Sequence, residues 1–331
     1  MPRIEARYYE KLDKERVRCL LCPHHCLLKE GQKGICRVRV NESGKLFTLN
    51  YEEVVSLALD PIEKKPLFHF YPGKLILSAG TFGCNFSCAF CQNYLLAQEN
   101  PGSRRIDSDT MAEIALKARK EDSIGIAFTY NEPSIWYEYI LETAKKLKEN
   151  DSQVVLVSNG YIDKAPLEEI LPFIDAMNID LKAFSDSFYK RLCKGKLEAV
   201  KETIERAVGM THVEITTLVI PGENDNMKEI ADMAKWIASL NPEIPFHLSR
   251  YHPAYRLQKS PTPIQTLKEA QNIARKYLDF VYTGNIAEEN NTVCKECGQI
   301  LIKRNVYDTQ ICGLQENRCI NCGSPINYIK T

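Results

Sequence analysis

The chain has 331 residues, 44% of them hydrophobic and 26% charged, a composition typical of a globular enzyme. Lys plus Arg equals Asp plus Glu at 43 each, so the net charge does not favour nucleic acid or an anionic membrane as a partner. No apolar segment approaches the length of a membrane span, and no apolar signal-peptide stretch follows the charged residues 1–7. We therefore expect a soluble cytoplasmic protein that binds neither nucleic acid nor a membrane.

Cysteine is abundant, with 13 residues in the chain, and the spacing of these residues indicates their use. All except Cys193 fall into three groups with the short spacings found in metal sites. In a cytoplasmic chain this arrangement favours bound metals over disulfides.

Residues 1–18 are predicted to form a charged helix that leads into the first cysteine group. This group has the spacing C-x2-C-x3-C-x9-C and consists of Cys19, Cys22, Cys26 and Cys36. Four thiolates can hold one tetrahedral zinc ion or a second iron–sulfur cluster, and we favour zinc because the segment is compact. His24 or His25 could replace a thiolate, and four unrelated thiols are the alternative without a metal.

Residues 38–49 are predicted to form a hairpin, because two extended runs flank a turn that contains Gly44. The segment 60–70 contains two prolines and is expected to be an irregular connector. His69 lies there between two aromatic residues, where it could either pack or reach a functional site.

The second cysteine group follows residues 75–79, an apolar run that predicts a buried strand. Its spacing is C-x3-C-x2-C over Cys84, Cys88 and Cys91, in a loop at the strand end where α/β barrels carry their chemistry. Closely spaced thiolates suit iron–sulfur clusters, but three ligands leave one iron of a four-iron cluster open. The alternatives are a zinc site without a visible fourth ligand and three structural thiols.

This spacing, with the aromatic Phe90 before the last cysteine, resembles the signature of the radical S-adenosylmethionine (SAM) superfamily. The resemblance implies a [4Fe-4S] cluster on the three cysteines, with SAM bound to the open iron. It also implies that reductive cleavage of SAM yields a 5′-deoxyadenosyl radical, which abstracts hydrogen from a substrate. Because an open iron is sensitive to oxygen, we expect anaerobic or protected conditions.

Strand and helix patterns alternate across residues 75–282. Strands are predicted at 75–80, 124–129, 153–158, 175–181, 212–220 and 244–249, and helices at 108–121, 134–150, 164–172, 186–209, 226–240 and 263–278. Six βα units indicate an α/β fold with a parallel sheet, and the block is too short for a complete eightfold barrel. We expect a partial (βα)6 TIM-like barrel, as the resemblance also implies, with a small turn at 282–285.

Polar residues follow the predicted strands, at the edge where they would surround the cysteine loop. Their chemistry and the resemblance together suggest the residues that bind SAM: Asn131, Glu132, Ser158, Asn159, Asp180, Lys182, Ile220 and Gly222. The family pattern Gly-Gly-Glu is replaced here by Tyr130-Asn131-Glu132, which leaves open whether Asn131 or Glu132 grips the amino group. Alternatively, Glu132 begins a helix, and Asp180 and Lys182 form a structural ion pair.

The last predicted strand supplies the candidate catalytic residues that would contact the substrate. They are His247, Arg250 and Tyr251. His247 could equally be a core histidine.

The third cysteine group lies in the tail, around the strand-like residues 299–307. Cys294 with Cys297, and Cys319 with Cys322, form two C-x2-C-G knuckles, which predict a zinc ribbon. The metal would supply the folding energy that so small a core lacks. Cys312 is left over as a substitute ligand, and a rubredoxin-type iron or an auxiliary cluster is the alternative to zinc.

Four features together resemble the radical SAM member of the AmmeMemoRadiSam system, related to pyruvate formate-lyase activating enzyme. They are Cys-Leu-Leu-Cys-Pro-His-His-Cys, Asp-Pro-Ile-Glu-Lys-Lys-Pro, Gly-Thr-Phe-Gly-Cys-Asn-Phe and the tail ribbon. The resemblance implies Memo-type and AMMECR1-type proteins as partners. We divide the chain into a cysteine-rich and hairpin module (1–72), a radical SAM barrel (73–287) and a zinc-ribbon tail (288–331).

We expect a radical SAM oxidoreductase that takes electrons from a ferredoxin or flavodoxin and acts on an unidentified small molecule or protein. One alternative is a glycyl-radical-enzyme activase, which acts on a protein backbone. An alternative of another class is a redox-silent zinc-ribbon scaffold or binding protein.

Overall fold

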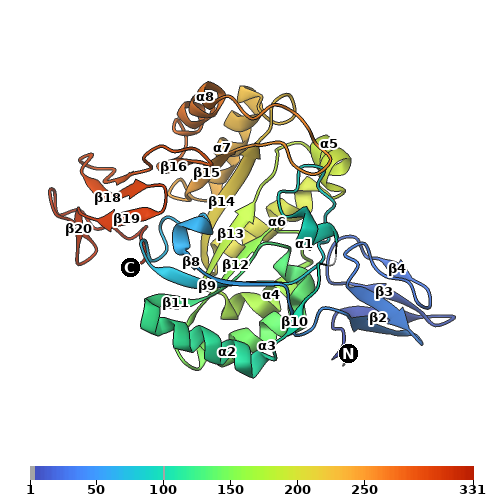
Figure 1. Cartoon of the computed structure of the whole chain (residues 1–331). Coiled ribbons are helices and arrows are strands. Elements are labelled where there is room, and N and C mark those ends of the chain that lie inside the picture. Colours follow the sequence, from blue (N-terminus) through green and yellow to red (C-terminus); the bar gives the residue numbers. More distant parts are fainter. Residues whose placement is uncertain (1–3, 100) are drawn as a thin grey trace.

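The structure, a computed structural model, describes residues 4–99 and 101–331. Its centre is an eight-stranded sheet in the spatial order β16-β15-β14-β13-β12-β11-β9-β8 (Figure 1). The strands from β16 to β9 pair in parallel, and β8 (Ser56–Pro61) pairs antiparallel with β9. Among the described strands β8 and β16 do not pair, so the sheet is open, as expected for a partial barrel.

The predicted apolar runs form the parallel strands. These are β9 (Leu75–Gly80), β11 (Ser123–Phe128), β12 (Gln153–Ser158), β13 (Ala176–Asp180), β14 (His212–Val219), β15 (Phe246–Arg250) and β16 (Val281–Gly284). The first six agree closely with the predicted bounds, because strands buried on both faces are continuous apolar runs. The turn predicted at 282–285 is wrong, since most of it belongs to β16, which is too short to show a pattern.

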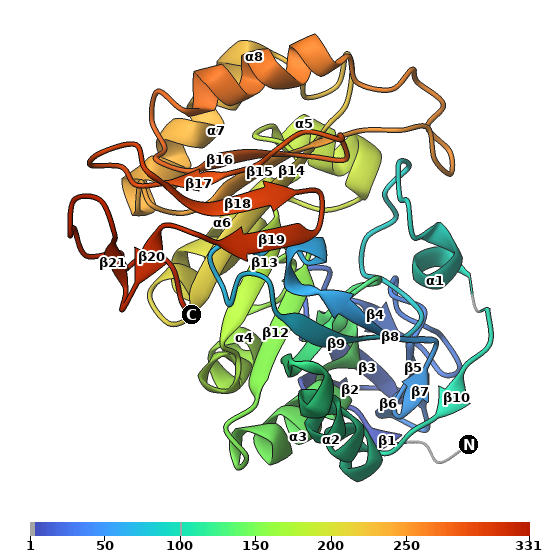
Figure 2. The same cartoon turned by 60° about the vertical axis from the view of Figure 1, so that its left-hand side comes forward.

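Six helices connect the parallel strands and cover one face of the sheet (Figures 1 and 2). They are α2 (Ser108–Lys117), α3 (Tyr137–Lys148), α4 (Lys164–Ile170), α6 (Leu197–Val208), α7 (Met227–Leu240) and α8 (Ile264–Ala274). Asp107 and Asn226 cap α2 and α7 through side-chain oxygens. In the described part of the chain, no helix has the length and apolarity needed to cross a membrane.

The single helix predicted at 186–209 is wrong. A short α5 (Asp186–Phe188) continues as a π-helical turn (Tyr189–Cys193), and α6 begins only at Leu197. Gly195 explains the interruption, because a Cβ there would lie 2.3 Å from the ring of Phe86 in the cysteine loop. The helix is therefore interrupted where this segment packs against the cysteine loop.

The helix predicted at residues 1–18 is also wrong for the described part. Residue 4 begins a set of short strands: β1 (Ile4–Glu5), β2 (Tyr9–Leu12), β3 (Arg16–Cys19) and β4 (Leu27–Leu28). Lys14 and Glu15 form the turn between β2 and β3 with φ of 60° and 53°. Glycine or asparagine usually marks such a turn in a sequence, and neither occurs at these two positions. The predicted hairpin at 38–49 is confirmed as β5 (Arg39–Glu42) and β6 (Lys45–Thr48).

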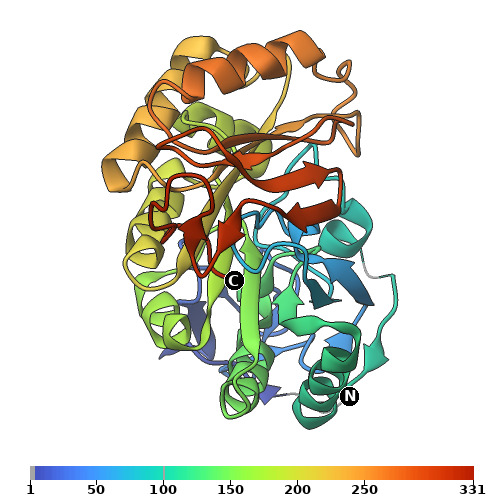
Figure 3. The same ribbon diagram turned by 90° about the vertical axis from the view of Figure 1, so that its left-hand side faces the viewer.

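The tail lies against the open sheet (Figure 3). It contains β17 (Thr292–Val293), β18 (Ile300–Asn305), β19 (Asp308–Ile311), β20 (Leu314–Gln315) and β21 (Arg318–Cys319). Arg304 donates to the Phe68 carbonyl oxygen, and the Lys330 amide donates to that of His69 at 2.8 Å. The remaining short elements are β7 (Glu53–Val54), β10 (Arg104–Arg105) and α1 (Tyr94–Gln98).

Candidate metal centre and cofactor site

The triad of Cys84, Cys88 and Cys91 follows β9 at the carboxyl edge of the parallel sheet. Burial raises the pKa of the Cys84 and Cys91 thiols, that of Cys91 to about 11. The neighbouring Cys193 thiol, together with burial, raises the pKa of Cys88. Thiolates at these positions therefore need a cation beside them, as metal coordination provides.

The triad sulfurs are too far apart to share one metal ion. Within residues 4–99 and 101–331, only the tail has three or more Cys, His or acidic ligand atoms that all lie within 4.8 Å of one another. The spacing does not support the alternative of a zinc ion on the triad. It fits thiolates that each bind a different iron of one cluster.

Asn131 holds the loop that carries the triad. Its Oδ1 accepts from the Thr81 amide at 3.1 Å, and its Nδ2 donates to the Gly83 carbonyl at 2.9 Å. Both ends of the amide thus bind the protein itself. Asn131 is a positioning residue in this structure, and its contact with SAM remains a prediction.

Two N–H donors face the sulfur of Cys84. Asn159 Nδ2 lies 3.7 Å from Cys84 Sγ, and the backbone amide of Phe86 donates to the same sulfur at 3.3 Å. Such donors stabilise a thiolate ligand. Asn85 Oδ1 accepts from Asn159 Nδ2 at 2.8 Å and so orients this amide. The role of Asn85 was not predicted, although an amide between two cysteines in an apolar loop was an available signal.

Glu132 is buried beside the triad, and its charge contributes to the raised pKa of Cys84. Its Oε1 accepts from the Ser134 amide at 2.9 Å and from Ser158 Oγ at 2.8 Å, and its Oε2 accepts from the Asn159 amide at 2.8 Å. The carboxylate therefore caps the short turn Pro133–Trp136, as the alternative interpretation holds. Oε2 keeps room for one further donor.

Asp180 and Lys182 form an ion pair of 2.8 Å beside Cys88. Burial opposes the charge on Lys182, but Asp180 and the thiols of Cys88 and Cys193 hold its pKa well above the ordinary value. The structure thus brings Cys193, isolated in sequence, next to the triad. The amide of Ser87 also donates to the Cys193 carbonyl at 3.0 Å.

The end of β14 forms a tight turn near this pair. Ile220 is buried, and Gly222 has a φ of +69°. Asn224 orders the turn, since its Oδ1 accepts from the Ile220 amide at 2.7 Å and its Nδ2 donates to the Lys182 carbonyl at 2.7 Å. Asn224 therefore joins the ends of β13 and β14, which both carry predicted SAM-binding residues. Asn224 itself was not among the predicted site residues.

A hollow of 530 Å³ is lined by Gln92, the residue after Cys91, and by His252, Pro253, Ala254 and Asn285. Arg250 and Tyr251 lie directly before it in sequence, at the end of β15. Arg250 Nε donates to the Thr262 carbonyl at 2.7 Å, and Tyr251 donates its hydroxyl to the Leu257 carbonyl at 2.6 Å. Their catalytic roles remain predictions.

His247 lies elsewhere, as the second residue of β15 and hence near the amino edge of the sheet. Its Nε2 lies 2.6 Å from Glu214, whose carboxylate also accepts from His212 at 3.0 Å and from the amides of Phe68 and His69 at 2.9 and 2.7 Å. Burial opposes ionisation, but the hydrogen bonds from His212 and His247 hold the pKa of Glu214 well below its ordinary value. The structure does not bring His247 to the triad, which favours its interpretation as a core histidine.

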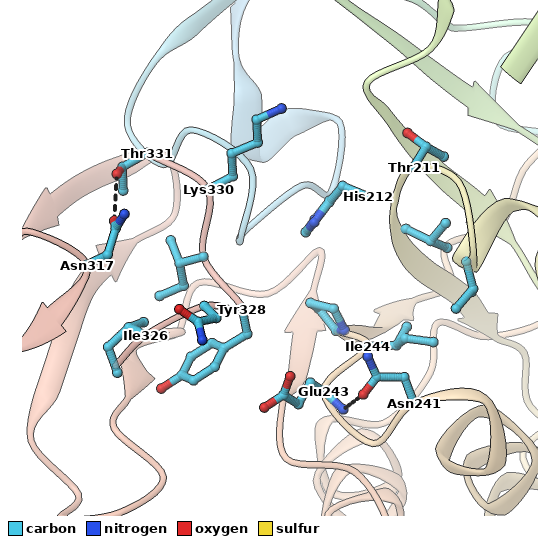
Figure 4. Close-up of a pocket in the computed structure, with 15 residues that line it drawn as sticks. Thr211, His212, Asn241, Glu243, Ile244, Asn317, Ile326, Tyr328, Lys330 and Thr331 are labelled. Carbon is cyan, nitrogen blue, oxygen red and sulfur yellow. Dashed lines mark hydrogen bonds between the residues drawn. The ribbon is translucent and has the colours of Figure 1, made fainter. Parts of the chain in front are cut away.

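His69 belongs to this amino-edge group as a packing residue. It is fully buried, with Nε2 2.7 Å from the Tyr282 hydroxyl, and burial lowers its pKa to about 3. A cavity of 510 Å³ lies nearby, between the starts of β14 and β15 and the tail (Figure 4). His212, Glu243, Tyr328 and Lys330 are among its lining residues, and none of the predicted site residues lines it.

The other two cysteine groups differ in their spacing. In the tail quartet of Cys294, Cys297, Cys319 and Cys322 all sulfurs converge, with contacts of 3.8 Å and 3.6 Å across the two knuckles. Four thiolates about 2.3 Å from one zinc ion would lie at such separations. Cys312 is exposed, lies outside this group and approaches the Ile300 carbonyl at 3.7 Å.

Comparison with known proteins identifies the family. The radical SAM superfamily profile matches residues 79–234. An uncharacterized protein of Methanocaldococcus jannaschii is 43% identical over 98% of this chain and 99% of its own length. A protein of the same organism, named as a glycyl-radical enzyme activating enzyme, is 26% identical over 61% of this chain and 77% of its own length.

A solved structure also shows the likeness of fold. Streptococcus suis SuiB bound to S-adenosylmethionine aligns with a TM-score of 0.52 and 13% identity, over 68% of this chain and 53% of that chain. The chain belongs to the radical SAM superfamily, a family of enzymes that use a [4Fe-4S] cluster and SAM. The relative that matches its full length has no assigned function.

Proposed function

We propose that this chain is a radical SAM oxidoreductase that abstracts hydrogen from a substrate still to be identified. The observation that carries the proposal is the triad, whose sulfurs do not converge as the ligands of one ion do and which lies beside the pair of Asp180 and Lys182. When bound, a reduced [4Fe-4S] cluster supplies the electron that splits SAM into methionine and a 5′-deoxyadenosyl radical, which takes hydrogen from the substrate.

In this proposal the protein orients SAM through charged and polar groups around the triad. Lys182 offers an ammonium to the carboxylate of SAM, and the acceptor capacity left on Glu132 Oε2 suits its ammonium. The remaining contacts are proposed for Asn131, Ser158, Asn159, Asp180, Ile220 and Gly222. We propose that Arg250 and Tyr251 contact the substrate, since they directly precede His252, which lines the hollow with Gln92.

We also propose the division into modules 1–72, 73–287 and 288–331, with zinc in the tail quartet. The converging tail sulfurs support zinc over a cluster at that position. Membership of the AmmeMemoRadiSam group, with Memo-type and AMMECR1-type partners and a ferredoxin or flavodoxin as electron donor, is proposed from the sequence resemblance alone.

A glycyl-radical-enzyme activase is the second candidate, because a relative of that name aligns over 61% of this chain. Its substrate would be the backbone of another protein. Turnover of a small molecule by the isolated chain would contradict it. A redox-silent zinc-ribbon scaffold is the candidate of another class.

Anaerobic SAM cleavage tests the proposal. The full chain is reconstituted with iron and sulfide, reduced with dithionite and given SAM, and 5′-deoxyadenosine is measured by chromatography. We expect 5′-deoxyadenosine from the wild type and none above background from a variant with Cys84→Ala, Cys88→Ala and Cys91→Ala. Failure of the folded, iron-loaded wild type to form this product would favour the scaffold.

A further inference from the structure

The N-terminal quartet consists of Cys19, Cys22, Cys26 and Cys36. Hydrogen bonding of the Cys19 amide to the Cys26 carbonyl at 3.0 Å joins the ends of β3 and the following loop. All four cysteines line one small cavity of 10 Å³, and they lie close enough for the four thiols to interact electrostatically. The fold thus gathers four potential ligands around a common centre.

The sulfurs of this quartet do not converge as those of the tail quartet do. Across the described residues, no three of them lie within 4.8 Å of one another, whereas all four tail sulfurs do. Thiolates on a single zinc ion would be about 3.8 Å apart, from tetrahedral bonds of about 2.3 Å. Like the triad, which binds a cluster in this superfamily, the N-terminal quartet therefore lacks the close convergence of a site for one metal ion.

The cavity between the sulfurs agrees with this spacing. A water-sized sphere therefore fits between the sulfurs. Sulfurs about 2.3 Å from a shared centre would leave no such room. A four-iron cluster needs sulfurs farther apart, since each thiolate binds its own iron.

A buried cation lines the same cavity, and one of its donors is unused. Arg39 is 1% exposed and lines the cavity, and its guanidinium binds Glu138 at 2.7 Å and the Arg7 carbonyl at 2.7 Å. Arg39 Nε has no hydrogen-bond partner among the described residues. A negatively charged thiolate or cluster sulfide would satisfy this donor, whereas neutral thiols are weak acceptors.

The N-terminal quartet also lies against the loop of the triad. A Cβ on Gly83, the residue before Cys84, would lie 2.8 Å from the Cys36 carbonyl oxygen. His24 Nε2 lies 2.8 Å from the Asn85 carbonyl oxygen on the other side of that loop. The two cysteine groups are therefore adjacent sites in one packed unit.

We infer that the N-terminal quartet holds a second, fully ligated [4Fe-4S] cluster, and not the zinc ion that its compact sequence favoured. This second cluster has four protein ligands and no open iron. It is consequently not a second SAM site.

Metal analysis of the triad variant (Cys84→Ala, Cys88→Ala and Cys91→Ala) tests the inference. After anaerobic reconstitution, we expect about eight irons per chain in the wild type, and about four irons with one zinc in the variant. The dithionite-reduced variant should show an electron paramagnetic resonance signal that SAM does not change. A folded triad variant with about two zinc ions and no iron would overturn the inference.

A combined variant, with Cys22→Ala and Cys26→Ala added to the triad variant, is the control for adventitious iron. Its iron should fall to background, and retention of about four irons would also overturn the inference. If this variant does not fold, the iron and zinc content of the triad variant decides. A wild type with eight irons that does not cleave SAM would contradict the proposed function and leave the second cluster in place.

Discussion

The two edges of the parallel sheet both bury polar groups, but they differ in what those groups bind. At the amino edge, Glu214 accepts hydrogen bonds from two histidines and from the amides of Phe68 and His69. At the carboxyl edge, the triad thiols have raised pKa values, although the charge of Lys182 lowers the pKa of Cys88 and Cys91. A buried carboxylate that accepts from four donors indicates a structural role, whereas buried thiols with raised pKa values indicate a site.

The amino edge shows what this structural role is. Glu214 fixes segment 68–69 inside the open side of the sheet, and the tail then binds that segment through Arg304 and Lys330. At the carboxyl edge, a hollow of 530 Å³ is lined by Gln92, the residue after Cys91. One edge of the sheet thus closes the fold, and the other edge carries the chemistry.

Loss of a triad ligand should give the largest effect at the carboxyl edge. In the variant Cys88→Ala we expect 5′-deoxyadenosine formation to fall to background, because two thiolates do not retain the cluster. The measurement is product formation together with iron content. Cys312→Ser is the matched control, and it should keep both at the wild-type level because Cys312 is exposed and outside the metal groups. Full activity of the Cys88→Ala variant would contradict the proposal that the carboxyl edge carries the chemistry.

Loss of Glu214 should give the largest effect at the amino edge. We expect Glu214→Ala to lower the free energy of unfolding by about 3–5 kcal/mol, because it leaves buried donors unpaired. Denaturant unfolding measures this change. The folded fraction should still cleave SAM at the wild-type rate per cluster. Loss of SAM cleavage without loss of stability would indicate that Glu214 takes part in the reaction.

His247 tests the difference between the two edges. The sequence suggested a catalytic role for it, but the structure places it near the amino edge. His247→Ala should cost about 1–3 kcal/mol of unfolding free energy, by removing a donor to the buried carboxylate. His247→Gln keeps a donor and should cost less. An Ala variant as stable as the wild type would speak against the structural role.

His69 predicts a pH dependence of stability. Burial lowers its folded pKa to about 3, so below a pH of about 6.5 the unfolded chain binds a proton that the folded chain excludes. Stability should therefore fall with decreasing pH, by about 1.4 kcal/mol per unit between these values. The comparison is with His69→Gln in urea unfolding from pH 6.5 to 5. Equal slopes for both proteins would show that His69 is not held neutral.

The sequence predicted local features well. The strand runs and the hairpin at 38–49 follow from patterns a few residues long. The triad was recognisable because its spacing lies within a single loop. The break at Gly195 was not predictable, because it depends on a contact with Phe86, far away in sequence. The strands β2 and β3 pair locally, and they were missed because their turn at Lys14 and Glu15 contains no glycine or asparagine.

The sequence by itself determined the kind of metal site, through three closely spaced cysteines after an apolar strand. It also determined the parallel sheet, through the alternation of strands and helices. What only the tertiary structure decided is where each polar group lies and how far apart the sulfurs are. His247 and Asp180 have similar local sequence patterns, yet they lie near opposite edges of the sheet. The two quartets likewise differ, since the sulfurs of the tail quartet converge and those of the N-terminal quartet do not.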